Sequence, residues 1–495
     1  MNRVARQLAA FGPGWVLVGV GVVVSVAAIG QGCGPPRGSI GGGGGGGGGG
    51  NLEFADAAMS DVDLAMAPPC SGLTCLQVNC GELSQTTLNG TVYAPNGTLP
   101  LYNAVVYIPN AKVTAFTDGL SCDRCNGQVS GSPLVLATTG PDGRFSLVNV
   151  PAGDNIPLVV QLGKWRRQVS IPHVPQCTTT KLDAKYTSLP SNHKEGDIPR
   201  MAIATGSADP MECLLLKIGL DPNEIKEPGN KTRVEFYKAA NSPGTSISGN
   251  TPSAADPSKG LYASLKRLVN YDIVMLPCEG SEYDQSVGRK NLVDFVNMGG
   301  RVFATHYSYD WLTYDASPFN KIAKPTDANG LWPKRQTDFP SDAVTTTAKL
   351  VTNFPKGMAF AKWLKFAGAT SAPGFLDILA IRHDINGVAP ALAQAWATDS
   401  FTGTDPMGNP TTTPGTPQLT FNTPVDPGHD DAGVAEYCGR IVYSDFHVAQ
   451  SEANQFNPFP GACMLGPMSD QEKALAFMLF DLSSCVQSDQ APPIF

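Results

Sequence analysis

The sequence predicts a multidomain chain, in which a small β-sandwich precedes an α/β domain with a doubly wound parallel sheet. Over residues 81–187, short apolar runs separated by Gly and Pro recur without a helical period, which is typical of a sandwich. Over residues 196–488, apolar runs alternate with helical patterns, which is typical of an α/β sheet. Within that range, residues 271–312 read strand, helix, strand, and this order predicts a βαβ unit with parallel strands.

The N-terminus is predicted to be an export signal over residues 1–33. Two arginines precede an apolar run at 15–29, and Cys33 follows among small residues. This order is typical of bacterial lipoprotein signals, so Cys33 is a candidate lipidation site, although Gly30 stands where such signals usually have Leu. Alternatively, residues 11–29 remain as an uncleaved anchor, because they are long enough to span a bilayer. We expect an outer-membrane or surface lipoprotein of the bacterial cell envelope, with the membrane as a partner through its N-terminus.

Residues 34–80 are predicted to be a flexible linker, because they include an unbroken glycine run at 41–50 and no apolar pattern that could form a core. The whole chain has 35 Lys and Arg against 43 Asp and Glu, a formal net charge of −8, and no long basic run. This charge pattern argues against nucleic acid as a partner. A carbohydrate or another envelope protein is the expected partner instead.

The chain has twelve cysteines, and eleven remain when Cys33 is set aside as a lipid acceptor. In an exported protein most of these should form disulfides. The odd number leaves open one free thiol, one pair across the two halves of the chain, or a Cys33 that stays a thiol. Cys122 and Cys125 have the spacing of a redox or zinc motif, but no second CxxC or CxxH lies nearby. We therefore expect these two to form a tight disulfide loop.

Two stretches of the first predicted domain carry a family resemblance. They are GTVYAPNGTLPLYNAVVYI, which contains an Asn-Gly turn, and TTGPDGRFSLVNVPAG, in which a turn enters a strand. Both resemble the carboxypeptidase regulatory-like domain, a transthyretin-like sandwich. The resemblance implies a non-catalytic module over residues 81–187.

The second predicted domain begins with a short apolar strand at 199–206, followed by a helix at 211–218 that Ser207 or Asp209 can cap. Near its end, residues 439–447 read as a strand that finishes in polar groups. The last helix is expected at 468–482, with Ser469 as its cap and Glu472 three residues later in a capping box.

Three motifs of this domain carry a second resemblance: YDIVMLPCEG, FVNMGGRVFATH and GRIVYSDFH. They resemble the ThuA-like branch of the class I glutamine amidotransferase-like superfamily, which implies a flavodoxin-like α/β fold over residues 196–488. Enzymes of that superfamily place a cysteine nucleophile at a strand-to-helix elbow. Here the matching residue is His306, and Ser308 stands where a glycine is usual. The resemblance therefore implies a domain that is inactive as a glutaminase.

Polar side chains follow the predicted strands at their carboxyl ends, where α/β proteins place their sites. One hypothesis makes Cys278 a nucleophile, with His306 as its base and Glu279 as the group that orients the base. The alternative is a disulfide between Cys213 and Cys278, because both should lie at the same edge of the sheet. We expect the disulfide.

A second hypothesis concerns a metal or a sugar at the same strand ends. His306, His447 and Asp445 would suit a divalent metal, whereas the alternative is a pair of partly buried histidines bonded to loop carbonyls. The aromatic residues after His306 could bind a sugar ring or pack against the following helix; they are Tyr307, Tyr309, Trp311 and Tyr314. No other cofactor is expected.

From these features we expect an exported, lipid-anchored envelope protein with a binding or scaffolding role, related to carbohydrate. An enzyme is the less favoured alternative, namely a hydrolase or sugar-modifying enzyme that uses His306, His447 and Cys278.

Overall fold

The computed structural model describes residues 70–281, 283, 286–313, 318–325, 345–379, 381, 383–404, 409–431, 433–448 and 457–494. The predicted signal with Cys33, most of the predicted linker and Tyr314 lie outside these residues, so what the sequence predicts for them stays a prediction. Within the described ranges, no helix is long and apolar enough to cross a membrane.

The βαβ unit predicted at 271–312 is present. Every residue of β11 (Ile273–Leu276) and β12 (Arg301–Thr305) is buried, and the two strands pair in parallel. Helix α4 (Ser286–Asn297) connects them, and Gly299 follows it with a φ of +122°, a backbone conformation that favours glycine. The apolar runs and the glycine thus define this unit locally.

The two strands belong to a ten-stranded sheet whose halves differ in strand direction. Six strands are parallel in the order β9-β10-β8-β11-β12-β19: β8 (Met201–Thr205), β9 (Ile225–Lys226), β10 (Val234–Lys238), β11, β12 and β19 (Gly439–Ser444). Four more strands continue from β19 with antiparallel pairing, in the order β18-β17-β14-β15: β14 (Thr346–Leu350), β15 (Phe375–Ile378), β17 (Ala393–Thr404) and β18 (Pro410–Thr423). The sheet is therefore mixed, which corrects the prediction of a wholly parallel sheet.

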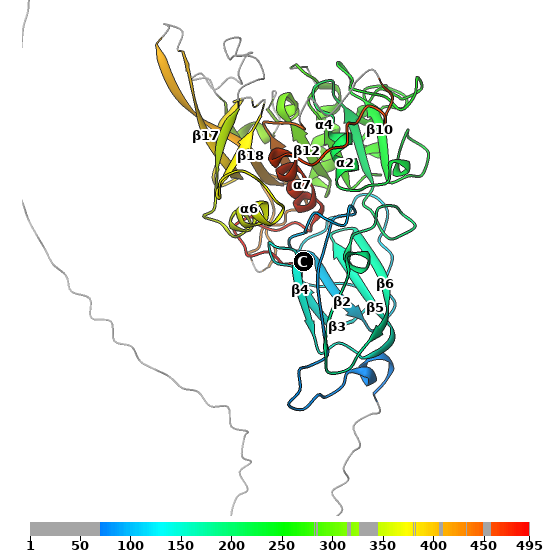
Figure 1. Cartoon of the computed structure of the whole chain (residues 1–495). Helices are drawn as coiled ribbons and strands as arrows, with labels where there is room; N and C mark the ends of the chain where they lie inside the picture. Colours follow the sequence, from blue (N-terminus) through cyan, green and yellow to red (C-terminus); the bar gives the residue numbers. More distant parts are fainter. Residues whose placement is uncertain are drawn as a thin grey trace, which may run out of the picture. The chain divides into compact units, whose positions relative to one another are not determined.

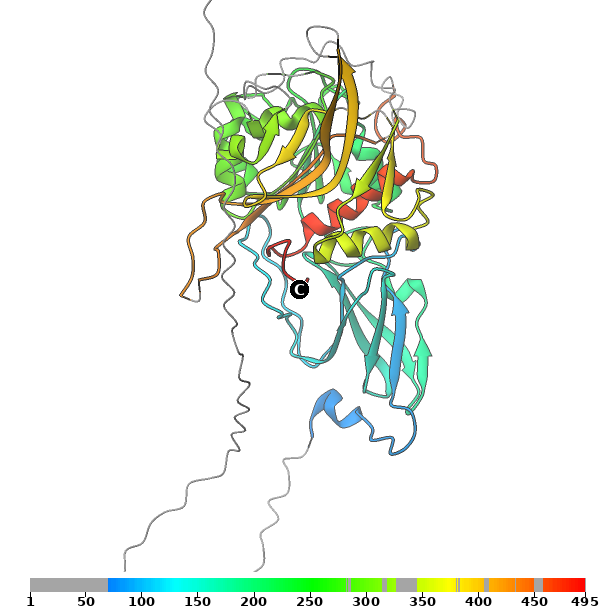
Figure 2. The same ribbon diagram turned by 90° about the vertical axis from the view of Figure 1, so that its left-hand side faces the viewer.

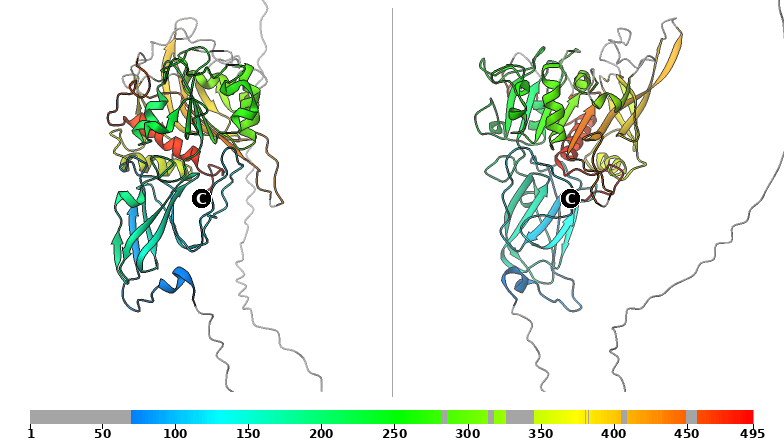
Figure 3. Two further views of the ribbon diagram at one scale, coloured as in Figure 1. Left: turned by 90° about the vertical axis from the view of Figure 1, so that its right-hand side faces the viewer. Right: turned by 180° about the vertical axis from the view of Figure 1, so that it is seen from behind.

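The sequence does not predict the antiparallel half, because its two longest strands lack apolar alternation. β18 also contains several prolines, which usually argue against a strand inside a sheet. The two strands nevertheless pair over most of their length and form a hairpin that extends beyond the rest of the sheet (Figures 1 and 3).

Helices cover both faces of the parallel half. Ile273 and Met275 of β11 belong to one core cluster together with α2 (Met211–Lys217) and α7 (Asp470–Ser483). Val274 and Leu276 point to the other face and pack in the cluster that contains α4. This layering is that of a doubly wound sheet (Figure 1). The predicted capping box between Ser469 and Glu472 is confirmed at the start of α7.

The following helices and strands also belong to the described chain. They are η1 (Gly72–Leu76), α1 (Ala184–Thr187), η2 (Pro222–Glu224), η3 (Leu261–Ala263), α3 (Leu265–Leu268), η4 (His306–Tyr309), α5 (Asp310–Thr313), η5 (Pro318–Lys321), α6 (Pro355–Phe366) and the pair of strands β13 (Ala323–Pro325) and β16 (Ile385–Val388).

The first part of the described chain forms two small sheets with a shared core. One has the order β4-β1-β7: β1 (Thr87–Thr91), β4 (Arg144–Val148) and β7 (Thr179–Lys181). The other has the order β3-β2-β5-β6: β2 (Val105–Pro109), β3 (Pro133–Thr138), β5 (Gly153–Leu162) and β6 (Trp165–Val174). Leu88 and Phe145 of the first sheet share a core cluster with Val106 and Leu158 of the second. The two sheets therefore pack against each other, as a sandwich requires.

The two small sheets and the mixed sheet share hydrophobic packing, and residues 68–495 form one compact unit. The ring centroids of Trp165 and Phe480 are 5.9 Å apart, and the Trp363 indole N–H donates to the Pro100 carbonyl at 2.7 Å. Figure 2 shows α6 and α7 side by side next to the small sheets. The two predicted domains are thus packed together through α6 and α7.

The cysteine pairs differ from those expected. Five disulfides are present: Cys70–Cys75, Cys80–Cys177, Cys122–Cys438, Cys125–Cys485 and Cys213–Cys463. Cys122 and Cys125 therefore form no tight loop. Their segment instead pairs with the chain after α7, because the Val486 amide donates to the Asp123 carbonyl at 2.8 Å and the Cys125 amide donates to the Val486 carbonyl at 3.1 Å. This pairing holds Cys125 beside Cys485.

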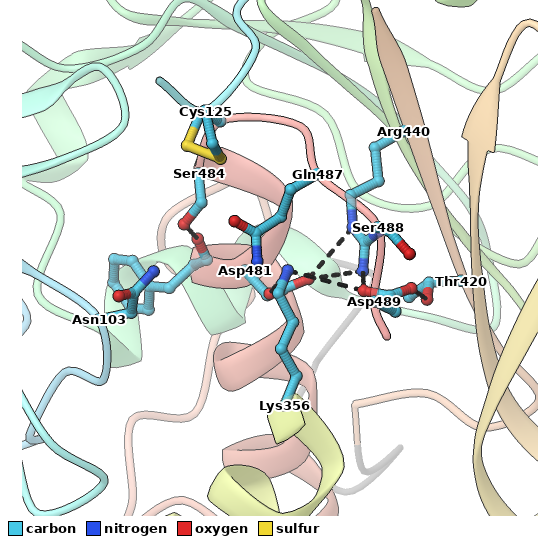
Figure 4. Close-up of polar contacts among 12 residues, drawn as sticks. Asn103, Cys125, Lys356, Thr420, Arg440, Asp481, Ser484, Gln487, Ser488 and Asp489 are labelled. Carbon is cyan, nitrogen blue, oxygen red and sulfur yellow. Dashed lines mark hydrogen bonds and ion pairs between the residues drawn. A yellow bond between two sulfur atoms is a disulfide. The ribbon is translucent and has the colours of Figure 1, made fainter. Parts of the chain in front are cut away.

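A buried charge network lies where α6, α7, β19 and the C-terminal segment meet (Figure 4). The Arg440 guanidinium, 1% exposed, donates to Asp481 at 2.9 Å and to Asp489 at 2.7 Å. The Lys356 ammonium lies 2.8 Å from Asp481, and the Thr420 hydroxyl donates to Asp489 at 2.7 Å. Two cations and two carboxylates are thus satisfied together away from water.

Candidate functional site

The carboxyl ends of four parallel strands bring together residues that are distant in the sequence. β8, β11, β12 and β19 are neighbours in the sheet order β8-β11-β12-β19. Shortly after their last residues come Asp209, Cys278, His306 and His447 respectively. Parallel strands end at the same edge of a sheet, so these side chains converge there.

Cys278 is a fully buried free thiol. The expected disulfide with Cys213 is absent, because Cys213 is bonded to Cys463. The Cys278 Sγ atom lies 3.1 Å from Nδ1 of His306, and it accepts a hydrogen bond from the Gly280 amide at 3.2 Å. Burial raises the pKa of this thiol, although the Gly280 and Tyr307 amides favour the thiolate.

His306 stands at a sharp turn between β12 and η4. Its φ is +49°, in the left-handed region that non-glycine residues rarely adopt. The Tyr443 hydroxyl donates to the His306 carbonyl at 3.0 Å and so holds this turn from the neighbouring strand. The turn directs the imidazole toward Cys278.

His447 completes the cluster from the end of β19. Its ring centroid lies 4.4 Å from that of His306, and its carbonyl accepts a hydrogen bond from the Gln471 side chain at 2.6 Å. One ligand atom each from Cys278, His306 and His447 lies within 4.8 Å of the others, and all three residues are buried. A tetrahedral zinc ion, with Zn–N and Zn–S bonds of about 2.0 and 2.3 Å, needs ligand atoms roughly 3.5 Å apart. The donor set and its spacing therefore fit a divalent transition metal with small side-chain adjustments.

Two other predicted site residues bind elsewhere. The Asp445 carboxylate accepts a hydrogen bond from the Asp384 amide at 2.8 Å. It also lies 3.0 Å from the Tyr443 hydroxyl, whose single hydrogen it shares with the His306 carbonyl, and Asp445 is not in the three-residue cluster. Among the described residues, Cys278 takes the place in the candidate metal-binding cluster that the sequence assigned to Asp445. The Glu279 carboxylate accepts from the Asn241 and Ser242 amides at 2.9 and 3.1 Å, so it anchors a neighbouring loop.

Two of the candidate aromatic residues are buried. Tyr309 and Trp311 are each 1% exposed, and Tyr307 is half-buried. The Trp311 ring packs on Tyr262, with ring centroids 4.6 Å apart. Tyr309 and Trp311 lie in the core cluster that also contains α4.

Asp209 is a site residue that the sequence does not predict as such. It was a candidate helix cap, but α2 begins without a side-chain cap. Its carboxylate instead accepts hydrogen bonds from the Thr305 hydroxyl and from the Val448 amide, the latter at 3.0 Å. The Thr305 hydroxyl in turn accepts a hydrogen bond from the Cys278 amide at 3.1 Å. Asp209 therefore connects the segments that carry Cys278, His306 and His447, and its burial raises its pKa to about 7.

The only sequence signal for this role was a polar residue just after a buried strand. Such a residue can cap the next helix or turn into the site, and only the position of the neighbouring strands distinguishes the two.

No family model matches the chain, and no curated protein sequence matches it significantly. Among solved structures, it is similar to a protein of Bacteroides uniformis ATCC 8492 named as ThuA-like, with 9% identity and a TM-score of 0.26 over 57% of this chain and 89% of that chain. A Cohesin–X-Dockerin complex from Acetivibrio cellulolyticus has 15% identity and a TM-score of 0.15 over 28% and 85%. A β-galactosidase from Rahnella sp. R3 has 14% identity and a TM-score of 0.23 over 59% and 33%. Similarities this low carry no argument about family or function.

Proposed function

We propose that this protein is an exported binding protein of the bacterial cell envelope, whose α/β part is organised around a divalent transition-metal ion. The observation that carries the metal is the convergence of Cys278, His306 and His447, whose ligand atoms lie within 4.8 Å of one another. Thiolate and imidazole together are ligands that zinc prefers. A bound cation would also deprotonate the buried thiol, whose pKa is raised in its absence.

The cysteine usage supports export. Ten cysteines of the described chain are paired in five disulfides, and such pairs persist in oxidising compartments. Together with the predicted signal at 1–33, this supports a place at the cell envelope, with Cys33 or an uncleaved segment as the anchor.

Burial of the cluster favours binding over catalysis. Cys278 is 0% exposed and both histidines are 1% exposed, so a substrate could reach the sulfur only after the loops move. Burial of all the ligands is typical of a structural metal, although three protein ligands leave a fourth coordination position open, as in catalytic zinc sites. The proposal also includes two domains that the sequence motifs support. One is a ThuA-like domain at 196–488 without glutaminase activity, and the other is a carboxypeptidase regulatory-like module at 81–187.

A cysteine hydrolase is the second candidate. The distance of 3.1 Å between Cys278 Sγ and His306 Nδ1 is that of a nucleophile and its base. In this candidate His306 would draw the proton from the thiol, and the loops over the strand ends would open to admit a substrate.

Metal analysis tests the proposal. Protein exported into an oxidising compartment and exposed to zinc should hold about one zinc ion per chain by mass spectrometry. Cobalt in its place should give thiolate-to-metal charge-transfer absorption, which Cys278→Ser should abolish. His447→Gln should lower zinc content, whereas the exposed control His173→Gln should not. Absence of bound zinc, cobalt, nickel and copper in the folded wild-type chain would rule out the metal centre, and rapid alkylation of Cys278 at neutral pH would then favour the hydrolase.

A further inference from the structure

A cavity of about 250 Å³ lies apart from the strand-end cluster, between the sheet that contains β2, β5 and β6 and the chain after α7. Its walls come from four segments: the start of β2, the insert at 110–132, the β5–β6 turn and the residues after α7. Figure 4 shows Asn103, Cys125 and Ser484, three of the residues in this region, near one another. None of the three proposed metal ligands lines the cavity.

The walls are held in place by bonds between distant segments. The disulfide Cys125–Cys485 ties the insert to the residues after α7. The Arg166 guanidinium lies 4.0 Å from the centroid of the Phe116 ring and donates to the Ser130 hydroxyl at 3.3 Å, so it fixes the insert to β6. Because the walls of this cavity are already held in place, ligand binding costs little conformational entropy of the protein. A lower entropy cost gives a higher affinity.

Both arginines of the lining are already paired. Arg166 lies 2.8 Å from Asp197, and Arg124 lies 3.5 Å from Glu436. Asp123 is the carboxylate of the lining, and its backbone carbonyl accepts a hydrogen bond from the Arg301 guanidinium at 3.5 Å. The lining therefore offers no cluster of one charge that would select an ionic ligand.

The remaining polar groups are amides and hydroxyls around an apolar floor. The amides are those of Asn103, Asn126, Gln128 and Gln161, and the hydroxyls are those of Thr114 and Ser130. Each of these groups both donates and accepts hydrogen bonds. Val105 and Val129 pack in one small core cluster beneath them, and the Phe116 ring adds an aromatic wall.

We infer that this cavity binds a neutral carbohydrate. A sugar hydroxyl donates and accepts at the same atom, as the lining amides and hydroxyls do, and the C–H faces of a sugar ring suit the valine floor and the Phe116 wall. The volume equals that of about eight waters at ~30 Å³ each, enough for one sugar ring. The inference names a ligand class for the proposed binding role and rests on that role, but it does not depend on the metal.

The test uses the exported chain with its disulfides intact. Isothermal titration with cellotetraose, maltotetraose, xylotetraose and chitotetraose should show at least one of them binding with a Kd of about 1 mM or tighter. Gln128→Ala removes one exposed lining amide and should weaken that binding about fivefold. Ala115→Trp fills the cavity from an exposed position and should abolish it. Gln85→Ala, an exposed glutamine that does not line the cavity, should leave binding unchanged.

Each variant should keep the melting temperature and the zinc content of the wild type, which separates failure of this inference from failure of the metal proposal. The inference is overturned if none of the four saccharides binds, or if binding survives in Ala115→Trp. It is also overturned if an uncharged Gly/Ser/Thr peptide binds at this cavity and the saccharides do not.

Discussion

The Thr305 hydroxyl donates a hydrogen bond to the buried carboxylate of Asp209, although the two residues are 96 positions apart. Thr305 ends β12, directly before His306, and Asp209 follows β8. The same hydroxyl accepts a hydrogen bond from the Cys278 amide, and the same carboxylate accepts one from the Val448 amide. This pair therefore sets the relative positions of the three loops that carry Cys278, His306 and His447.

Replacing Thr305 by valine should lower the free energy of unfolding by about 1–3 kcal/mol. The change leaves the Asp209 carboxylate without one donor and the Cys278 amide without its acceptor, both in buried surroundings. Urea unfolding measures the effect. Thr347→Val is the matched control, because the exposed Thr347 hydroxyl makes a similar bond to Asp377 at 2.7 Å, and it should cost no more than about 0.5 kcal/mol. Equal losses in the two variants would contradict the role of the Asp209–Thr305 pair.

Arg440→Met should destabilise the protein by roughly 3–5 kcal/mol. The substitution leaves the buried carboxylates of Asp481 and Asp489 to share the Lys356 ammonium, so their charges are no longer balanced. Denaturant unfolding at neutral pH is the measurement. As a control, Lys290→Met breaks an exposed pair with Asp294 at 2.6 Å and should change stability by less than about 0.5 kcal/mol. A small effect at Arg440 would show that the network in Figure 4 adds little to stability.

The stability of the wild type should fall as the pH rises from about 5 to 8, in part because of Glu212. Burial raises the pKa of this carboxyl from 4.5 to about 8, and nearby Asp209 raises it further. Its Oε2 atom has no hydrogen-bond partner among the described residues. Between these two pKa values the folded state holds the proton and the unfolded state loses it, so each rise in pH favours unfolding. Below pH 4.5 both states are protonated, and above pH 8 both are ionised.

Glu212→Gln should remove this contribution and flatten the curve of stability against pH between about 5 and 8. At pH 8 the variant should be more stable than the wild type by an amount on the order of a few kcal/mol. Urea unfolding at several pH values measures the slopes, and the exposed Glu82→Gln serves as the control. Parallel curves for the wild type and Glu212→Gln would contradict the raised pKa.

A non-reducing peptide map should recover Cys122 with Cys438, Cys125 with Cys485 and Cys213 with Cys463. Cys278 should be alkylated only after unfolding, because it is buried and its pKa is raised. Adding zinc before unfolding should slow alkylation further if the metal centre forms. A Cys122–Cys125 peptide, or Cys278 bonded to Cys213, would contradict this structure.

Much of the parallel half could be predicted from local sequence. β11, β12, β19 and α7 are marked by apolar runs, by a glycine after α4 and by the Ser469–Glu472 capping box, and all of these act within a few residues of the chain. The antiparallel half could not be predicted in the same way. β18 pairs with β17 and with β19 in spite of its prolines, so these long-range pairings decide its place inside the sheet.

The candidate site was predicted only in outline. The sequence placed Cys278, His306 and His447 at strand ends, because each follows an apolar run. It favoured a Cys213–Cys278 disulfide, which is wrong, because the pairing depends on where the segment of Cys463 lies. It likewise could not show that Trp311 is buried against Tyr262.

By itself, the sequence determined the local elements, the predicted export signal and the residue types available at the carboxyl edge of the sheet. The tertiary structure decided which of those residues meet. Cys278 reaches His306 and His447 because β11, β12 and β19 are neighbours, and Asp445 turns away because Tyr443 and Asp384 bind its carboxylate. The physical reason is range: apolar patterning and capping act over a few residues, whereas strand order, disulfide pairing and buried hydrogen bonds join segments that are far apart in the chain.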